Sequence, residues 1–287
     1  MAERQQRKDS HVRPPLPEPL PDGFAVVDNH AHLDHEADDD TVRALLSAAR
    51  EVGVDRHVSV GCDLDSARWT VGAVQRFPEV LGGVAIHPNE APRRAAAGDL
   101  DEALAEIERL AGHPRIRVVG ETGMDTFRTD FADTAAAAAQ EASFRAHIEL
   151  AKRLDKPMQI HDRDAHEEVL AVLADAGAPE RTVFHCFSGD AEMARLCAGQ
   201  GWHVSFAGPV TFKNAAGLRA ALAEVPLELL LVETDSPYLT PMPYRGRPNS
   251  GYLVPLTVRA MAEVLDLPVE QVCQSISANS EALYGPW

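Results

Sequence analysis

The stretch FAVVDNHAHLDH, residues 24–35, joins a short apolar run to three titratable side chains. The run at residues 24–27 has the composition of a buried β-strand, and it stops at Asp28, which His30 and His32 follow closely. Polar side chains held together at the end of a buried strand are costly unless something binds between them. Imidazole and carboxylate are both metal ligands, so this strand end predicts a divalent cation site.

Seven further apolar runs of strand length follow along the chain, and helical patterns separate them. These runs end near positions 61, 87, 121, 161, 185, 207 and 235. A (β/α)₈ barrel of about 250 residues uses about 31 residues per unit, which matches this spacing. The runs are apolar throughout, as in parallel strands that helices cover on both faces. We therefore predict a TIM barrel of the α/β class, formed by a single domain over residues 23–287.

Residues 1–22 are polar and then rich in proline, which predicts a disordered or extended tail outside the site. The chain has four cysteines without a C-x-x-C pair, which argues against a disulfide framework and against a cysteine zinc site. The first residues contain no apolar segment, so we expect neither a signal peptide nor a membrane span. These features together predict a cytoplasmic protein that has no membrane partner.

The net charge of −17 disfavours a broad electrostatic grip on long duplex DNA. A phosphate substrate would have to be held locally, and bound cations are one source of local positive charge. The glycine-containing segments lack the phosphate-loop pattern, so no nucleotide cofactor is expected.

Polar side chains recur where the predicted strands end. Since the carboxyl ends of barrel strands meet at one mouth, we expect these side chains to converge there. They are Asp28, His30 and His32 after the first strand, His87 after the third, Glu121 after the fourth, His161 after the fifth, His185 after the sixth and Asp235 after the eighth. We assign ordinary structural roles to the other histidines, which are His11, His35, His57, His113, His147, His166 and His203.

Two of these carboxylates together with four of these histidines would be too many ligands for one four-coordinate ion and about the right number for two ions. Glu121 lies between the other ligands in strand order, so it is the expected bridge. Two ions about 3.5–4 Å apart can clamp a phosphoryl group and lower the pKa of a water molecule. The donor set predicts zinc, manganese or magnesium.

The acidic stretch HEADDD, residues 35–40, resembles a calcium cluster, but its position before TVRALL favours a helix N-cap.

Eight motifs in order resemble those of the TatD family of metal-dependent deoxyribonucleases. The likeness spans residues 24–284, and the family's fold is the TIM barrel. The motifs are VVDNHAHLD, GVAIHP, VVGETGMD, PMQIHDRDAHEEVL, FHCFSGD, SFAGPVTFKN, LLLVETDSPYLTPMPYRGRPNS and ISANS.

This resemblance implies roles for the predicted site residues. One ion would lie among His30, His32, Glu121 and Asp235, and the second among Glu121, His161 and His185. Asp235 would also orient or deprotonate the attacking water, and His87 would steady charge on the phosphate or the leaving oxygen. Asp28 is expected to accept a hydrogen bond from a ligand histidine.

Several cations are candidate substrate contacts. Arg163 has the planar guanidinium of a phosphate clamp, and its alternative is an ion pair with Asp162 or Asp164. Lys213, Arg245 and Arg247 lie on predicted mouth loops, where they would contact a nucleic-acid backbone or remain solvated.

The chain departs from the family pattern at two places. The family often has two tyrosines where this chain reads GMDTFR, which leaves Phe127 for base stacking. Ser250 and Gly251 replace an acidic residue and a proline after RGRPN. Neither change affects a predicted metal ligand.

The resemblance implies a 3′–5′ exodeoxyribonuclease that acts on DNA ends or short nucleic acids. One alternative is a binuclear amide, ester or lactone hydrolase, although such enzymes commonly bridge their metals with a modified lysine and this chain offers Glu121. The other alternative is a metal-binding interaction protein without catalysis, although His87 and Asp235 are both present.

Overall fold

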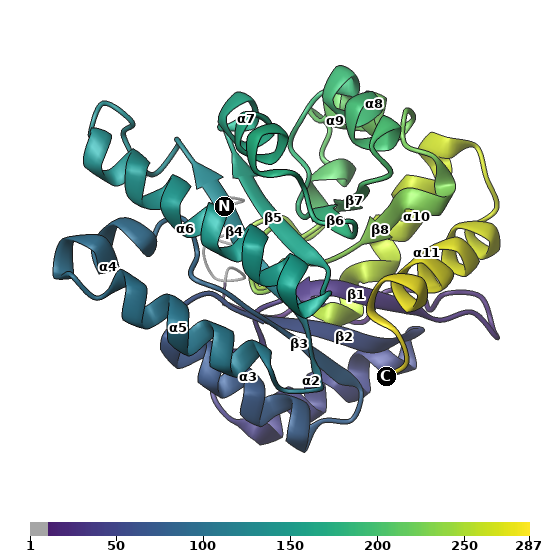
Figure 1. The fold of residues 1–287 in the computed structure, drawn as a ribbon. Helices are drawn as coiled ribbons and strands as arrows, with labels where there is room; N and C mark the ends of the chain where they lie inside the picture. The colour runs from purple at the N-terminus through teal and green to yellow at the C-terminus, as the bar shows by residue number, and fades with distance from the viewer. Residues whose placement is uncertain (1–10) are drawn as a thin grey trace, which may run out of the picture. The chain divides into compact units, whose positions relative to one another are not determined.

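The computed structural model describes residues 11–287 and confirms the (β/α)₈ fold class. Eight strands follow the sheet order β1 to β8, and helices separate them along the chain (Figure 1). The strands are β1 (Val26–Ala31), β2 (Val54–Gly61), β3 (Val80–Val84), β4 (Ile116–Asp125), β5 (Met158–Arg163), β6 (Thr182–Phe184), β7 (His203–Phe206) and β8 (Leu230–Val232).

Helices separate the strands, as the sequence predicted, and two further helices follow the last strand. The α-helices are α2 (Asp39–Glu51), α3 (Leu64–Arg76), α4 (Ala91–Ala97), α5 (Leu100–Ala111), α6 (Thr134–Leu154), α7 (His166–Ala176), α8 (Ala191–Gly199), α9 (Ala216–Leu222), α10 (Val254–Leu265) and α11 (Val269–Tyr284). Short 3₁₀ turns are η1 (Leu33–His35), η2 (Gly208–Thr211), η3 (Leu227–Leu229) and η4 (Gly251–Leu253).

The chain divides into two compact units, and the first combines residues up to 58 with residues 189–282. In this unit the last strand of the fold lies beside the first. Ala31 and Ser236 form a parallel bridge, and the Asp235 amide donates to the His30 carbonyl at 2.9 Å. Pairing of β8 with β1 therefore places Asp235 next to the histidines at the end of β1.

The second unit contains residues 59–188 and 283–287. Strands β3, β4, β5 and β6 pair in parallel within it. The pairing of β4 with β5 shifts register between Val119 and Thr122 and continues to Asp125 and Arg163. Glu121 lies inside this irregular part of β4, and His161 lies inside β5.

Helix starts follow local side-chain chemistry. The Asp38 carboxylate accepts from the Thr41 amide at 2.8 Å, which confirms that this acidic stretch caps α2. Asp63 and Ser66 form a reciprocal capping box at the start of α3. Asp133 caps α6, whose first turns consist largely of alanine, a strong helix former.

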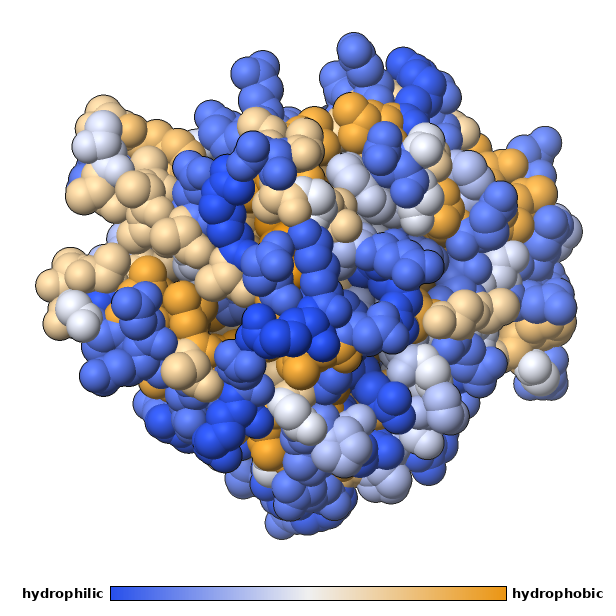
Figure 2. All heavy atoms as spheres, viewed as in Figure 1, coloured by the Kyte–Doolittle hydropathy of each residue, from blue (hydrophilic) through white to orange (hydrophobic). Residues whose placement is uncertain are grey.

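The alanine-rich surfaces of α4 and of the start of α6 form the pale-orange area at the left of Figure 2.

Residues 11–20, here called the N-terminal arm, belong to the first unit, contain no helix or strand and contact residues from its C-terminal half. Arg247 donates to the carbonyls of Val12 and Arg13 at 2.8 and 2.7 Å. The Tyr252 hydroxyl donates to the Pro14 carbonyl at 2.7 Å, and Leu20 is buried. The first ten residues of the predicted tail lie outside the described residues.

Among residues 11–287, no helix combines the length and apolar character that crossing a bilayer requires. All four cysteines are free thiols.

Candidate metal centre

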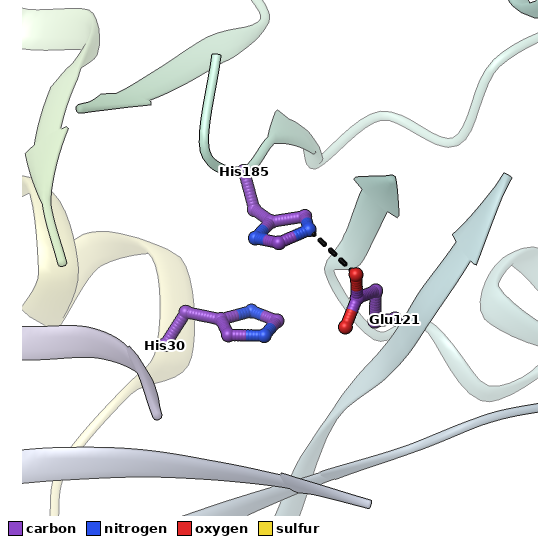
Figure 3. A group of neighbouring side chains, drawn as sticks. All are labelled: His30, Glu121 and His185. Carbon is purple, nitrogen blue, oxygen red and sulfur yellow. Dashed lines mark hydrogen bonds and ion pairs between the residues drawn. The ribbon is translucent and has the colours of Figure 1, made fainter. Parts of the chain in front are cut away.

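In the second unit, a buried carboxylate gathers three imidazoles. Oε1 of Glu121 lies 2.5 Å from His161 Nδ1, 2.9 Å from His185 Nε2 and 3.3 Å from His87 Nε2. Figure 3 shows the His185 ring directed at this carboxylate. We call these four residues the glutamate cluster. His185 directly follows β6 and His87 follows β3 by three residues, whereas β4 and β5 continue beyond Glu121 and His161 to Asp125 and Arg163, later than the strand ends that the sequence predicted.

The electrostatics of the glutamate cluster favour a bound cation. Burial raises the pKa of Glu121, but the charges of His185 and His87 and hydrogen bonds from His161 and His185 outweigh it, so the pKa lies well below its usual value. Burial lowers the pKa of His161, whereas hydrogen bonds to Asp125 and Glu121 raise it more strongly. The site thus stabilises an ionised carboxylate beside positive charge. A divalent cation can take the place of the imidazole protons.

Asp125 orients His161, a role that the sequence analysis did not identify. The Asp125 Oδ2 atom lies 3.3 Å from His161 Nε2 and accepts a hydrogen bond from the side-chain amide of Asn89 at 2.8 Å. Its Oδ1 accepts from the backbone amide of Arg128 at 2.7 Å. A carboxylate on one imidazole nitrogen leaves the other nitrogen to bind metal. In this arrangement Nδ1 of His161 is the nitrogen that remains available to a metal ion.

His87 differs from the other imidazoles of the cluster. Its Nδ1 accepts a hydrogen bond from the Asn89 backbone amide at 3.0 Å. A neutral imidazole whose Nδ1 accepts must carry its proton on Nε2, so the nitrogen that faces Glu121 is a donor rather than a metal ligand. This geometry agrees with the expected role of His87 next to a substrate phosphate.

In the first unit, His30, His32 and Asp235 form a second group, which we call the HxH cluster. Asp235 Oδ1 lies 3.2 Å from His32 Nε2 and 3.9 Å from His30 Nε2. His30, which Figure 3 also draws, is fully buried on β1. Asp235 adopts a left-handed backbone conformation with φ of 54°, which is uncommon for a residue other than glycine and typical of functional sites.

Asp28 supports the HxH cluster in a different way from that expected. Its carboxylate accepts from the amide and hydroxyl of Thr234 at 2.8 and 2.7 Å, and His57 Nδ1 lies 3.9 Å away. It therefore fixes the residue before Asp235 rather than a ligand histidine. A Cβ atom on Gly251 would lie 2.7 Å from the His57 ring, so this position has no room for a side chain.

The predicted substrate cations fall into different environments. In the second unit, Arg163 lies over the ring of exposed Phe127 at 4.1 Å, and within the described chain it forms no ion pair with Asp162 or Asp164. In the first unit, Arg245 lies 4.4 Å from the Phe212 ring centroid, and the adjacent Lys213 is exposed. Arg247 donates to two backbone carbonyls of the N-terminal arm, a contact that neither of its two expected roles included.

Among the described residues, one group in each unit has possible ligand atoms that lie within 4.8 Å of one another. These groups are His30, His32 and Asp235, and His87, Glu121 and His161. In the second group Glu121 and His161 are the candidate ligands, since Nε2 of His87 carries a proton. Nitrogen and carboxylate donors of this kind suit zinc, manganese and related divalent ions.

Comparison with known proteins identifies relatives that are described as metal-dependent. The family described as TatD related DNase matches residues 27–285. The chain is 45% identical to TatD of Mycobacterium tuberculosis, described as an uncharacterized metal-dependent hydrolase, over 91% of this chain and 98% of that protein. It is 34% identical to YcfH of Escherichia coli K12, also described as an uncharacterized metal-dependent hydrolase, over 90% and 95% of the two chains.

The chain belongs to the TatD family. It is therefore a metal-dependent hydrolase. The crystal structure of YjjV, a TatD homologue from Escherichia coli K12, superposes with a TM-score of 0.81 at 23% identity and covers 91% of this chain and 98% of its own. That likeness shows the shared (β/α)₈ fold.

A first prediction concerns Asp125. Replacing it with asparagine removes the carboxylate that orients His161, so we expect this TatD protein to lose about 10- to 100-fold in affinity for one zinc ion. Competition with a chelator would measure the affinity, and Asp101→Asn, an exposed change on α5, is the control. Unchanged zinc affinity in Asp125→Asn would contradict the assigned role.

A second prediction concerns His147, which the sequence analysis treated as ordinary. Its Nε2 accepts from the Ile86 amide at 3.1 Å and its Nδ1 lies 2.7 Å from the Ser143 carbonyl, so α6 holds the residue before His87. The pKa of His147 is lowered to about 4, because burial lowers it by more than the hydrogen bond to the Ser143 carbonyl raises it. The neutral ring is thus required in the folded protein.

Because the folded pKa lies below the unfolded value of about 6.5, protonation favours the unfolded chain. The stability that His147 contributes is complete above pH 6.5 and is lost as the pH falls towards 4, by about 3 kcal/mol in total. Urea unfolding of wild type and His147→Gln with a chelator present should give a stability difference that shrinks over this interval. A difference independent of pH would contradict the prediction.

Proposed function

We propose that this chain cleaves phosphodiester bonds of DNA and removes nucleotides from the 3′ end. In this proposal one divalent ion binds His30, His32, Glu121 and Asp235, and a second binds Glu121, His161 and His185. Membership of the TatD family supports the nucleic-acid substrate. The free thiols of all four cysteines suit a reducing compartment such as the cytoplasm.

The glutamate cluster is the observation that carries the proposal. A carboxylate that is 4% exposed and has imidazoles at 2.5, 2.9 and 3.3 Å on a single oxygen is a costly arrangement for a purely structural site. When bound, the ions supply positive charge for the phosphate oxygens and lower the pKa of a water molecule. A histidine-rich donor set favours zinc or manganese.

The chain's own residues then account for the movement of protons. Asp235 accepts a proton from the water whose oxygen attacks phosphorus. The bond from phosphorus to the 3′ oxygen of the preceding nucleotide breaks, and the Nε2–H of His87 donates a hydrogen bond that steadies the charge on that oxygen. The proton that Asp235 accepted then reaches the oxygen through solvent. The products are a shortened strand with a 3′ hydroxyl and a nucleotide that keeps its 5′ phosphate.

Phe127 and Arg163 are the proposed contacts for the terminal nucleotide. Phe127 lies two residues beyond Asp125, the last residue of β4. Arg163 is the last residue of β5, two residues beyond His161, and pairs with Asp125. An exposed aromatic ring can stack on a base of any sequence, and a guanidinium above it adds positive charge for the backbone.

A third prediction tests catalysis. Asp235→Asn should lower the rate on single-stranded DNA by at least about 100-fold, because the water loses its proton acceptor. Asp266→Asn is a matched control, since Asp266 is exposed and shares the left-handed backbone with φ of 52°. A 5′-labelled oligonucleotide should give progressively shorter products, and a 3′-labelled one should release labelled mononucleotide at once.

The same assays separate the alternatives. Chelation should abolish the DNA activity, and zinc or manganese should restore it. Turnover of a lactone or an acyl-amino acid with none of DNA would favour an amide or lactone hydrolase. Equal rates for wild type and Asp235→Asn would favour a protein that binds metal without catalysis.

A fourth prediction tests the stacking contact. Phe127→Ala should raise the KM for single-stranded DNA by about 5- to 150-fold, the equivalent of 1–3 kcal/mol of stacking, with little change in kcat. An oligonucleotide whose terminal nucleotide lacks a base should bind wild type and variant equally. Leu196→Ala, which alters another exposed apolar residue, is the control. A KM that does not distinguish the two oligonucleotides would contradict this role.

A further inference from the structure

Cys62 contacts the carboxylate at the centre of the glutamate cluster. It directly follows β2, and its Sγ lies 3.3 Å from Glu121 Oε2. The three imidazoles approach the other oxygen, Oε1, of the same carboxylate. The two oxygens of Glu121 therefore have chemically different surroundings within this unit, with nitrogen donors on one side and sulfur on the other.

The position of the thiol is fixed by the backbone. The Cys62 amide donates to Ser66 Oγ at 2.9 Å, where Ser66 belongs to the capping box of α3. The Cys62 carbonyl accepts from the His87 amide at 2.9 Å. Both main-chain polar groups of this residue are thus held by neighbours, so the sulfur is directed at Glu121 rather than placed on a free loop.

The distance between Cys62 Sγ and Glu121 Oε2 is compatible with both atoms binding one metal ion. Zinc binds carboxylate oxygen at about 2.1 Å and thiolate at about 2.3 Å, so atoms 3.3 Å apart would subtend an angle of about 97° at one ion. This angle lies between octahedral and tetrahedral values. A thiol is only a weak hydrogen-bond donor, so a hydrogen bond to Glu121 gives little reason for sulfur here.

We propose that Cys62 is a thiolate ligand of the divalent ion that Glu121 binds through Oε2. This inference rests on the metal centre of the proposed function. A soft sulfur ligand favours zinc or cobalt over magnesium and manganese, so Cys62 sets the metal preference of that position. It also makes the position sensitive to thiol oxidation, which removes the ligand.

Cobalt substitution tests the sulfur ligand through absorption rather than activity. The wild-type protein, stripped by a chelator and loaded with Co²⁺, should show a near-ultraviolet sulfur-to-cobalt charge-transfer band in addition to visible cobalt bands. Cys62→Ser should keep the visible bands and lose the charge-transfer band. Cys186→Ser, which alters the half-buried cysteine after His185, should retain both.

Zinc affinity provides a second readout. Cys62→Ser should lower the zinc affinity by at least about tenfold, the lower end of the range typical of residues that only support a ligand, while circular dichroism confirms the fold. Bound cobalt without a charge-transfer band in wild type, or a band that survives in Cys62→Ser, would overturn the assignment of Cys62 alone. Wild-type protein that binds no cobalt or zinc would overturn the proposed metal centre as well.

Discussion

The buried carboxylate of Glu121 is the constraint on which the rest of the site depends. An ionised group that is 4% exposed is costly to desolvate, and three imidazoles and a thiol compensate for that cost by approaching its two oxygens. An arrangement of this kind is stable only while positive charge remains beside the carboxylate. Protons can supply that charge in the empty site, and a divalent cation supplies more of it, which links metal binding to the integrity of the glutamate cluster.

The surrounding strands set the direction of each donor around that carboxylate. The Asp125 carboxylate contacts Nε2 of His161, and the backbone amide of Asn89 donates a hydrogen bond to Nδ1 of His87. These two contacts give two similar imidazoles different roles, since one presents a lone pair and the other a proton. Parallel pairing brings the ends of consecutive strands together, so the fold places the donors while hydrogen bonds beyond the ligands decide their chemistry.

Much of the fold and the ligand set could be predicted because both depend on local patterns. Apolar runs at regular spacing gave eight strands, and a polar residue at a run's end gave His30, Glu121, His161, His185 and Asp235 as candidates. The helix cap at Asp38 followed from composition in the same way. The residues that were missed depend on contacts distant in sequence. Asp125 meets His161 across 36 positions and Cys62 meets Glu121 across 59, and neither spacing leaves a periodic signal. The contacts of Arg247 could not be predicted for the same reason, because charge on a loop does not reveal which backbone carbonyls it binds.

The N-terminal arm has a practical consequence for handling the protein. Arg247 donates to two of its carbonyls and Tyr252 and Arg259 to one each, and Arg13 donates to Glu36 and to the Asn249 carbonyl. A recombinant version that starts at Phe24 would remove those acceptors and uncover the surface that Leu20 covers. The segment that carries Asp235 and Asn249 would then lose part of its anchorage. Affinity tags and cleavage sites are therefore better placed before residue 11 or at the C-terminus than at the boundary of the first strand.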